Sequence, residues 1–85
     1  MDARTLEERF AAGSEQALAD AIALYGQPLL RYCHHILCDY HEAQDAVQTT
    51  FVKAWLRRHT LRGGGQDNER AWLYRIAYQI GRAHV

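Results

Sequence analysis

The sequence predicts an all-α protein, a compact bundle of about four helices. Apolar residues recur at steps of three and four along most of the chain, which is the period of amphipathic helices. Residues that cap helices stand where these patterns begin, and no segment alternates between apolar and polar residues as a strand does. A chain of 85 residues has room for one core, so we expect residues 1–85 to form a single domain.

The first predicted helix is short and runs from about Leu6 to Ala12. Thr5 and Glu8 have the spacing of a capping box, which satisfies backbone N–H groups at a helix start. Gly13 is placed to end the helix, because glycine readily adopts the left-handed conformation found there. A helix of this length is not stable alone, so it must pack on the rest of the chain.

The second helical pattern begins at Ser14, a residue suited to the N-cap. Gly26 and Pro28 are expected to bend this helix or break it into two pieces, because proline lacks a backbone donor and clashes with the preceding turn. The apolar residues of the pattern are Leu18, Ile22, Tyr25, Leu29, Cys33, Ile36, Leu37 and Tyr40.

The third predicted helix starts after Asp39, which has capping-box spacing with Glu42. Basic residues near its C-terminus complement the helix dipole; they are Lys53, Arg57, Arg58 and His59. The apolar inner face comprises Ala43, Ala46, Val47, Thr50, Phe51, Ala54 and Trp55.

A glycine-rich stretch at residues 62–68 predicts a flexible loop, because three successive glycines do not hold a helix cheaply. The last helix then runs from about Glu69, with Asp67 or Asn68 as the cap. Its apolar positions are Trp72, Leu73, Ile76, Ala77 and Ile80.

Composition indicates a globular cytoplasmic protein. Hydrophobic residues make up 48% of the chain and charged residues 24%, which supports a packed core and argues against disorder. No apolar run approaches the roughly 18 residues of a membrane span, and the acidic N-terminus lacks the basic flank of a signal peptide. We therefore expect no membrane partner and no disulfide between Cys33 and Cys38, which point in different directions along one helix.

Charge is distributed unevenly although the net charge is zero. Residues 1–45 hold eight acidic and three basic side chains, a net charge of −5, whereas residues 46–85 hold two acidic and seven basic ones, a net charge of +5. This asymmetry indicates that the two halves meet different partners, and that the basic half meets a polyanion.

Catalysis finds no support in these residues. The glycines at 63–65 lack the Gly-Lys-Ser/Thr that follows in a phosphate-binding loop. The acidic residues Asp39, Glu42 and Asp45 are explained by a capping box and a solvated helix start. We therefore expect neither enzymatic activity nor a cofactor.

A metal site is a weaker alternative. His34, Cys38 and His41 fall on roughly one face if they share a helix. The favoured explanation is that Cys33 packs in the core beside surface histidines, so no metal ligand is assigned.

The aromatic residues divide into two groups. Trp55 closes the apolar stripe of the third helix and is assigned to the core. Trp72 and Tyr78 share the last helix with arginines, a mixture that suits single-stranded nucleic acid but also an ordinary solvated helix. These arginines are Arg70, Arg75 and Arg82.

Four stretches of the chain carry a family pattern: LYGQPLLRY at residues 24–32, AQDAVQTTFVKAW at 43–55, LRG at 61–63 and AWLYRIA at 71–77. In this order they resemble region 2 of the extracytoplasmic-function sigma factors of the sigma-70 family. The resemblance covers about residues 18–80. It implies a promoter-opening factor with core RNA polymerase, promoter DNA and an anti-sigma factor as partners.

The resemblance also implies a division of labour between helices. The second long helix and the polar face of the third would contact the clamp helices of the largest polymerase subunit, and helix periodicity independently leaves the matching positions of the third helix near its outer face. These positions are Asp45, Gln48, Thr49 and Val52. The loop and the last helix would capture the non-template single strand of the minus-ten element, with one base flipped out of the stack. The matching positions are Leu61, Arg62, Gly63, Arg70, Trp72, Arg75 and Gln79.

Several residues depart from the family pattern. Gln44 and Thr49 replace acidic residues, Gln79 replaces an asparagine, and Glu69 stands at a position that is usually aromatic and would put a negative charge beside DNA. These departures support an alternative, a sigma-like module that binds polymerase or an anti-sigma partner without opening promoters. The sequence ends at Val85 without a second helix-turn-helix domain, so we expect no reading of the minus-thirty-five element.

Overall fold

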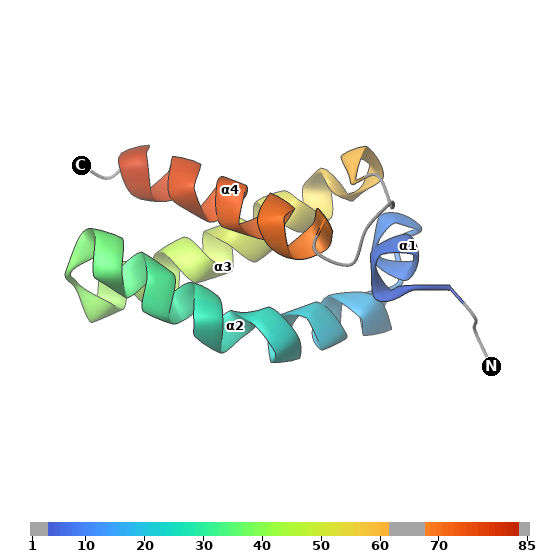
Figure 1. Cartoon of the computed structure of the whole chain (residues 1–85), viewed down its shortest axis with the longest axis horizontal. Helices are drawn as coiled ribbons and strands as arrows, with labels where there is room; N and C mark the ends of the chain where they lie inside the picture. The colour runs from blue at the N-terminus through green and yellow to red at the C-terminus, as the bar shows by residue number, and fades with distance from the viewer. Residues whose placement is uncertain (1–3, 62–67, 84–85) are drawn as a thin grey trace.

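The computed structural model describes residues 4–61 and 68–83, which form four α-helices and one turn of 3-10 helix (Figure 1). This confirms the predicted all-α bundle. Arg62, Gly63 and Asp67, to which the sequence assigned roles, lie outside the described residues. The elements in order are α1 (Leu6–Ala11), α2 (Glu15–Leu37), α3 (Tyr40–Leu56), η1 (Arg58–Thr60) and α4 (Asn68–Ala83).

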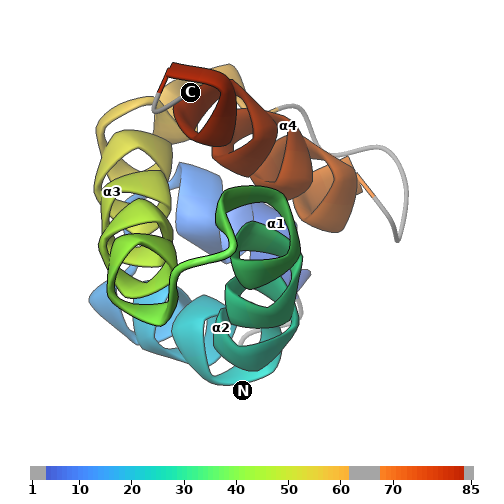
Figure 2. The ribbon, with the colours of Figure 1, turned by 90° about the vertical axis from the view of Figure 1, so that its left-hand side faces the viewer.

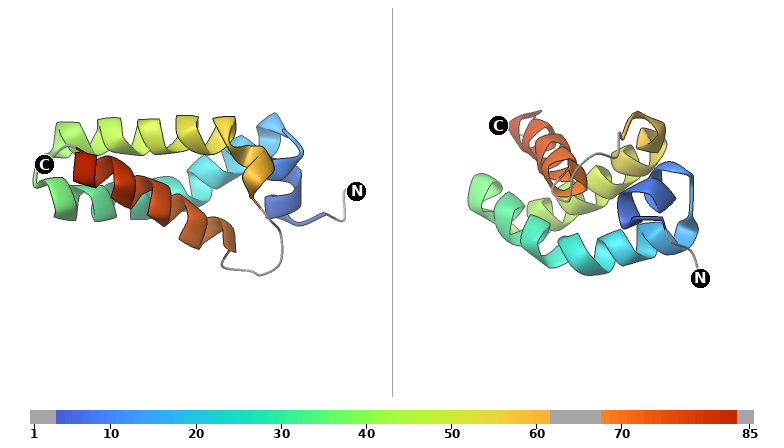
Figure 3. Two further views of the ribbon diagram at one scale, coloured as in Figure 1. Left: turned by 90° about the horizontal axis from the view of Figure 1, so that it is seen from above. Right: turned by 45° about the vertical axis from the view of Figure 1, so that its right-hand side comes forward.

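The helices α2 and α3 form a long antiparallel hairpin (Figure 1). Helix α4 lies across this hairpin and contacts both of its helices (Figure 2). Helix α1 packs against α2 and η1 at the end of the hairpin away from its turn (Figure 3). The resulting body is elongated, with extents of 41 × 20 × 20 Å.

The predicted caps of the first three helices are confirmed. Thr5 Oγ1 accepts a hydrogen bond from the Glu8 N–H at 3.1 Å, and Ser14 Oγ accepts one from the Ala17 N–H at 3.1 Å. Asp39 Oδ1 accepts one from the Glu42 N–H at 2.9 Å. Each such bond satisfies an N–H group that the helix itself leaves unpaired and contributes about 1 kcal/mol.

The predicted end of the first helix is confirmed, whereas Asn68 as the cap of the last helix is not. Gly13 follows the end of α1 with φ of 89°, a left-handed backbone that glycine adopts at little cost, as predicted. Asn68 is the first residue of α4, so it lies inside the helix and is not the cap.

Of the two outcomes predicted for the second helix at Gly26 and Pro28, the bend is confirmed and the break is not (Figure 3). Helix α2 is continuous over 23 residues and contains Pro28, and its ribbon bends rather than separates (Figure 3). Tertiary packing explains why the helix does not break. Ala21 before the proline and Leu29 after it are both fully buried in the same core, which holds the two halves together as one bent helix. The helix ends at Leu37, and Tyr40, predicted on its apolar face, begins α3 instead.

None of the helices in the described part of the chain combines the length and the apolar character that a membrane span needs.

Small residues at the helix contacts allow close packing. Six alanines are fully buried, so neighbouring helices approach with little side chain between them. Thr50, predicted on the inner face of the third helix, is also buried, and its hydroxyl donates to the Ala46 carbonyl at 2.7 Å. The predicted apolar faces of α3 and α4 are therefore confirmed. The buried apolar residues are Phe10, Ala17, Ala21, Leu29, Cys33, Ala43, Ala46, Phe51, Ala54, Leu61, Leu73, Ile76, Ala77 and Ile80.

Candidate functional site

The four residues assigned to polymerase contact form one stripe along the outer face of α3. Each of them has one other member three positions away and one four positions away along the helix, as the pairs 45/48, 45/49, 48/52 and 49/52 show, and all four are exposed. Val52 is 57% exposed, an unusual position for a β-branched apolar side chain. We call this surface the α3 stripe; it comprises Asp45, Gln48, Thr49 and Val52.

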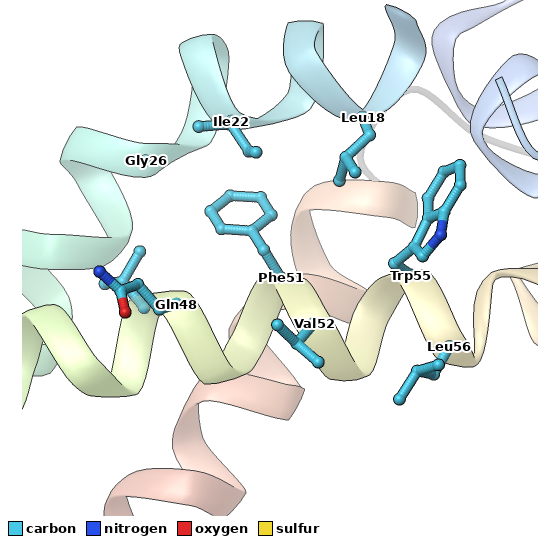
Figure 4. A pocket seen from close by; sticks show the side chains of 9 residues that line it. Leu18, Ile22, Gly26, Gln48, Phe51, Val52, Trp55 and Leu56 are labelled. Carbon is cyan, nitrogen blue, oxygen red and sulfur yellow. The ribbon is translucent and has the colours of Figure 1, made fainter. Parts of the chain in front are cut away.

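An apolar groove adjoins the α3 stripe, between α2 and α3. Its volume is about 510 Å³. Phe51 and Trp55 of α3 project towards α2, where Leu18 and Ile22 face them (Figure 4). We call it the α2–α3 groove; its lining residues are Leu18, Ile22, Gly26, Val47, Gln48, Phe51, Val52, Trp55 and Leu56.

The α2–α3 groove and the α3 stripe share Gln48 and Val52, so they form one continuous surface. Leu56, 66% exposed, extends the apolar part along α3. An apolar groove edged by polar side chains is the surface that a partner helix recognises, since it takes the apolar face of that helix and its polar residues remain at the edge. Sequence periodicity placed the polar stripe correctly but did not reveal the groove, because the groove needs residues of both helices.

A second, smaller hollow lies between η1 and α4. It has a volume of about 210 Å³ and brings together three residues that the sequence assigned to DNA, namely Trp72, Arg75 and Gln79. They share a face of α4 because they stand at steps of three and four. We call this site the α4 hollow; its lining residues are Arg57, Thr60, Trp72, Arg75, Ile76 and Gln79.

Arg57 and Thr60 of the α4 hollow were missed by the sequence analysis as DNA contacts. The sequence analysis assigned Arg57 only to the C-terminus of the third helix, where its charge complements the helix dipole. The structure does place Arg57 there, as the C-cap of α3. Its basic charge immediately before a glycine-rich connection to a basic helix was the available signal. The Thr60 hydroxyl donates to the Arg57 carbonyl at 2.7 Å, which fixes the short η1 turn against the hollow.

Trp72 has a dual environment. Its side chain is half-buried, and its ring meets the ring of Phe10 edge to face with centroids 6.2 Å apart. Arg75 and Gln79 are exposed beside it. The indole is thus held by the core on one side while the hollow opens on it from the other, an arrangement that orients an aromatic ring for stacking.

Two further residues assigned to DNA lie apart from the α4 hollow. Arg70 is exposed, but it points to another side of α4, with its guanidinium 5.1 Å from the ring centre of Tyr74. Leu61 is only 5% exposed, so its apolar side chain belongs to the core, where burial stabilises it. Its assignment to DNA stays a prediction, and the backbone is the part of this residue that could make such a contact.

Glu69 does not place a negative charge on the surface, contrary to the expectation from the sequence. Its side chain is 1% exposed, and neither carboxylate oxygen has a hydrogen-bond partner among the described residues. Burial first and the charge of Glu7 second raise the pKa of this carboxyl to about 7, against a smaller lowering by Arg9. The exposed charges of α4 are consequently all positive, and they belong to Arg70, Arg75 and Arg82.

Trp55 packs against the core, as predicted. Its ring meets Phe10 edge to face with centroids 5.6 Å apart. Arg58 covers the other side, with its guanidinium 4.5 Å from the ring centre and Nη1 donating to the Trp55 carbonyl at 2.8 Å. Tyr78, by contrast, is 47% exposed and contacts Arg82, so it remains on the surface of α4.

The metal alternative is contradicted within the described residues. Helix α2 ends at Leu37, and Cys38 adopts a left-handed backbone with φ of 57°, so His34, Cys38 and His41 do not share a helical face. Across residues 4–61 and 68–83, no three Cys, His, Asp or Glu side chains are placed to hold a metal ion. Cys33 is buried in the core, as the favoured explanation required.

Comparison with known proteins identifies relatives. The ECF RNA polymerase sigma factor SigW of Bacillus subtilis is 31% identical over 68 residues, which cover 80% of this chain and 35% of that protein. The RNA polymerase sigma-H factor of Pseudomonas aeruginosa is 31% identical over 80 residues, covering 94% of this chain and 40% of that protein. The RNA polymerase sigma factor CnrH of Cupriavidus metallidurans is 34% identical over 74 residues, covering 86% and 37%.

These relatives are longer proteins, and the chain spans between 35% and 40% of their length. No solved structure matched the chain. The family model described as Sigma-70 region 2 matches residues 21–81, which include α3, α4 as far as Gly81 and both candidate surfaces apart from Leu18. The chain therefore belongs to the sigma-70 family, as a region 2 domain of the extracytoplasmic-function type.

Proposed function

We propose that this domain acts in transcription initiation, by binding core RNA polymerase and capturing the non-template single strand of the promoter minus-ten element. One observation carries the proposal: the bundle presents two separate surfaces of different chemistry. The α3 stripe with the α2–α3 groove is polar and apolar, whereas the α4 hollow combines arginine, amide and aromatic groups. The relatives named as RNA polymerase sigma factors support the same division.

The polymerase partner would dock on α3. A helix of the clamp in the largest subunit would lay apolar side chains in the α2–α3 groove, beside Val52, and meet the polar groups of Asp45 and Gln48 at the edge. Asp45 is the one charged residue of the α3 stripe. Apolar contact would therefore supply most of the affinity. An anti-sigma factor would compete for this surface.

The DNA partner would bind at α4. Arg57 and Arg75 are positioned to neutralise phosphates, and the exposed side of Trp72 offers a face on which a base stacks, worth about 1–3 kcal/mol. Gln79 and the Thr60 hydroxyl supply groups that bond base edges. Arg62, Gly63 and Arg70 remain proposed contacts outside the α4 hollow.

No bond is broken in this proposal, so the domain is not an enzyme and needs no cofactor. Strand opening follows from binding the single strand more tightly than the duplex, against an unstacking cost of a few kcal/mol per base. The domain would act in the cytoplasm, where its two macromolecular partners meet.

A salt titration separates the two kinds of DNA contact. Fluorescence anisotropy with a labelled single-stranded minus-ten oligonucleotide is recorded for the wild type, Arg75→Ala, Trp72→Leu and the control Arg31→Ala, an exposed arginine of α2. We expect Arg75→Ala to weaken binding and to reduce the slope of log K against log salt by about 0.7, the value of one phosphate contact on a single strand. Trp72→Leu keeps an apolar side chain against Phe10 and should weaken binding about 5-fold or more with the slope unchanged.

The polymerase contact is tested by capture of core enzyme on the immobilised domain. Asp45→Lys should reduce capture, and the charge reversal Arg31→Glu on α2 should not. Full capture by Asp45→Lys would contradict the α3 assignment. Capture without any oligonucleotide binding would instead match the alternative, a module that binds polymerase and does not open promoters.

A further inference from the structure

Two buried glutamates, one on α1 and one in the first turn of α4, lie near enough for their charges to interact. Glu69 is 1% exposed and Glu7 is 8% exposed, although they are 62 positions apart in the chain. Within residues 4–61 and 68–83, three of their four carboxylate oxygens have no hydrogen-bond partner: Glu7 Oε2, Glu69 Oε1 and Glu69 Oε2. Buried carboxylates without donors are strongly disfavoured, so this contact requires an explanation that packing alone does not give.

The basic side chains nearest the two carboxylates are engaged with other groups as well. Arg9 of α1 acts favourably on Glu69, but its Nη1 also lies 3.5 Å from Asp20 Oδ2 of α2, so its charge is divided between Glu69 and Asp20. Arg58 of η1 is held on the Trp55 ring and carbonyl, and Arg70 of α4 lies over Tyr74.

A proton supplies the donor that the contact lacks. If Glu69 carries a proton, its O–H group can donate to the unpartnered oxygen of Glu7, and the repulsion between two like charges disappears. If the proton leaves, two carboxylates face each other in a site shielded from water. The rings of Phe10 on α1 and Trp72 on α4 meet edge to face, so this pair reports on the contact between the two helices.

We propose that Glu7 and Glu69 form a proton-operated latch: with one shared proton α1 is docked on the first turn of α4, and loss of that proton releases α1 from α4 while α1 stays packed on α2 and η1. Release would separate Phe10 from Trp72 and free the first turn of α4. The consequence for DNA capture rests on the proposed function, whereas the latch itself does not.

The direction of the effect follows from proton binding. The pKa of Glu69 is raised to about 7 in the folded chain, from 4.5 for an ordinary glutamate, by burial first and by Glu7 second. Between pH 4.5 and about pH 7 the folded chain therefore binds more protons than the unfolded chain, and stability falls as pH rises. The latch is closed on the acidic side of this window and opens as pH passes about 7.

NMR on the full 85-residue chain tests the latch directly. The carboxyl carbon of Glu69 should titrate with a midpoint near 7. The cross-peaks between the Phe10 and Trp72 rings should be present at about pH 5.5 and lost at about pH 8, on either side of that midpoint. In Glu69→Gln, which retains the shape without the titrating proton, the cross-peaks should persist at both pH values.

Two further variants keep the test decisive. Glu7→Gln removes the facing charge, so the midpoint of Glu69 should move to lower pH even if Glu69→Gln fails to fold. Glu8→Gln is the matched control, because Glu8 is exposed on the same helix, and it should leave the midpoint unchanged. A Glu69 midpoint near 4.5, or ring cross-peaks in the wild type that do not depend on pH, would overturn the latch. Neither result bears on DNA or polymerase binding.

Discussion

Replacing Phe10 with alanine tests whether α1 belongs to the domain. Phe10 is 1% exposed and lies between two tryptophans, with ring centroids 5.6 Å from Trp55 and 6.2 Å from Trp72. Its helix precedes residues 21–81, the part that the family model matches, so packing alone assigns it to the core. Truncating a buried phenylalanine costs about 3–5 kcal/mol, and two edge-to-face ring contacts place this site at the upper end.

The expected loss is a large fraction of the total. A domain of 85 residues has a free energy of unfolding of roughly 4–13 kcal/mol. Even a loss of about 3 kcal/mol, the lower end of that range, would lower the melting temperature by roughly 12–24 °C, at 4–8 °C per kcal/mol for a domain of this size. In urea, the midpoint should fall while the m-value stays constant, because the surface exposed on unfolding hardly changes.

Circular dichroism during thermal and urea unfolding measures the loss. Leu24→Ala is the matched control, since Leu24 is a large apolar residue that is 57% exposed on α2. We expect the control to change stability by less than about 0.5 kcal/mol. The packing of α1 is refuted if Phe10→Ala costs less than about 1 kcal/mol, or no more than Leu24→Ala.

Four other changes have defined outcomes. Gly13→Ala should lower the free energy of unfolding by about 1–2 kcal/mol in urea titrations, because φ of 89° is strained for alanine and the added Cβ would lie 3.3 Å from Arg58 Nε. Wild-type stability should fall by up to about 3 kcal/mol from pH 4.5 to about pH 7 relative to Glu69→Gln, at 1.36 kcal/mol per pH unit; parallel pH profiles of the two proteins would contradict the burial of an ionisable Glu69. Iodoacetamide should modify exposed Cys38 before Cys33, whose burial hides the thiol and raises its pKa; peptide mass spectrometry after brief labelling would show the order. Arg57→Ala should weaken oligonucleotide binding and reduce its salt slope by about 0.7, and an unchanged slope would remove Arg57 from the DNA surface.

The parts of the fold that the sequence predicted correctly depend on short-range physics. The N-caps Thr5, Ser14 and Asp39 each bond a backbone N–H three residues ahead, so the information lies within a single turn. The apolar faces of α3 and α4 follow from helical period alone. Local signals were therefore sufficient for four helices and for the exposure of the α3 stripe.

The misplaced features depend on contacts between distant residues. Pro28 stays inside one helix because both flanking segments pack on the same core, an energy that no local preference contains. Glu69 is buried where α1, from the other end of the chain, comes near it. No local motif links Glu69 to Glu7, so the sequence did not predict that the two side chains lie near each other. Arg57 and Thr60 join the α4 hollow only when η1 lies beside α4.

The family pattern supplied the roles, and helical geometry then sorted them. Trp72, Arg75 and Gln79 line one hollow, whereas Leu61 is buried and Arg70 lies over Tyr74 on another side of α4. A motif names positions along a chain, but only the packing decides which side chains share a surface. The DNA assignment therefore narrows to one face of α4 together with the end of α3.

The preference for single-stranded over duplex DNA is the most direct test of the proposed function. Anisotropy titrations of one labelled minus-ten sequence, as a single non-template strand and as a duplex, give the ratio of the two dissociation constants at the same salt concentration. We expect the single strand to bind more tightly, because its bases are free to stack on Trp72, whereas the bases of a duplex stack on one another. Trp72→Leu should therefore reduce the ratio towards one. Equal or tighter binding of the duplex would contradict strand capture by the α4 hollow.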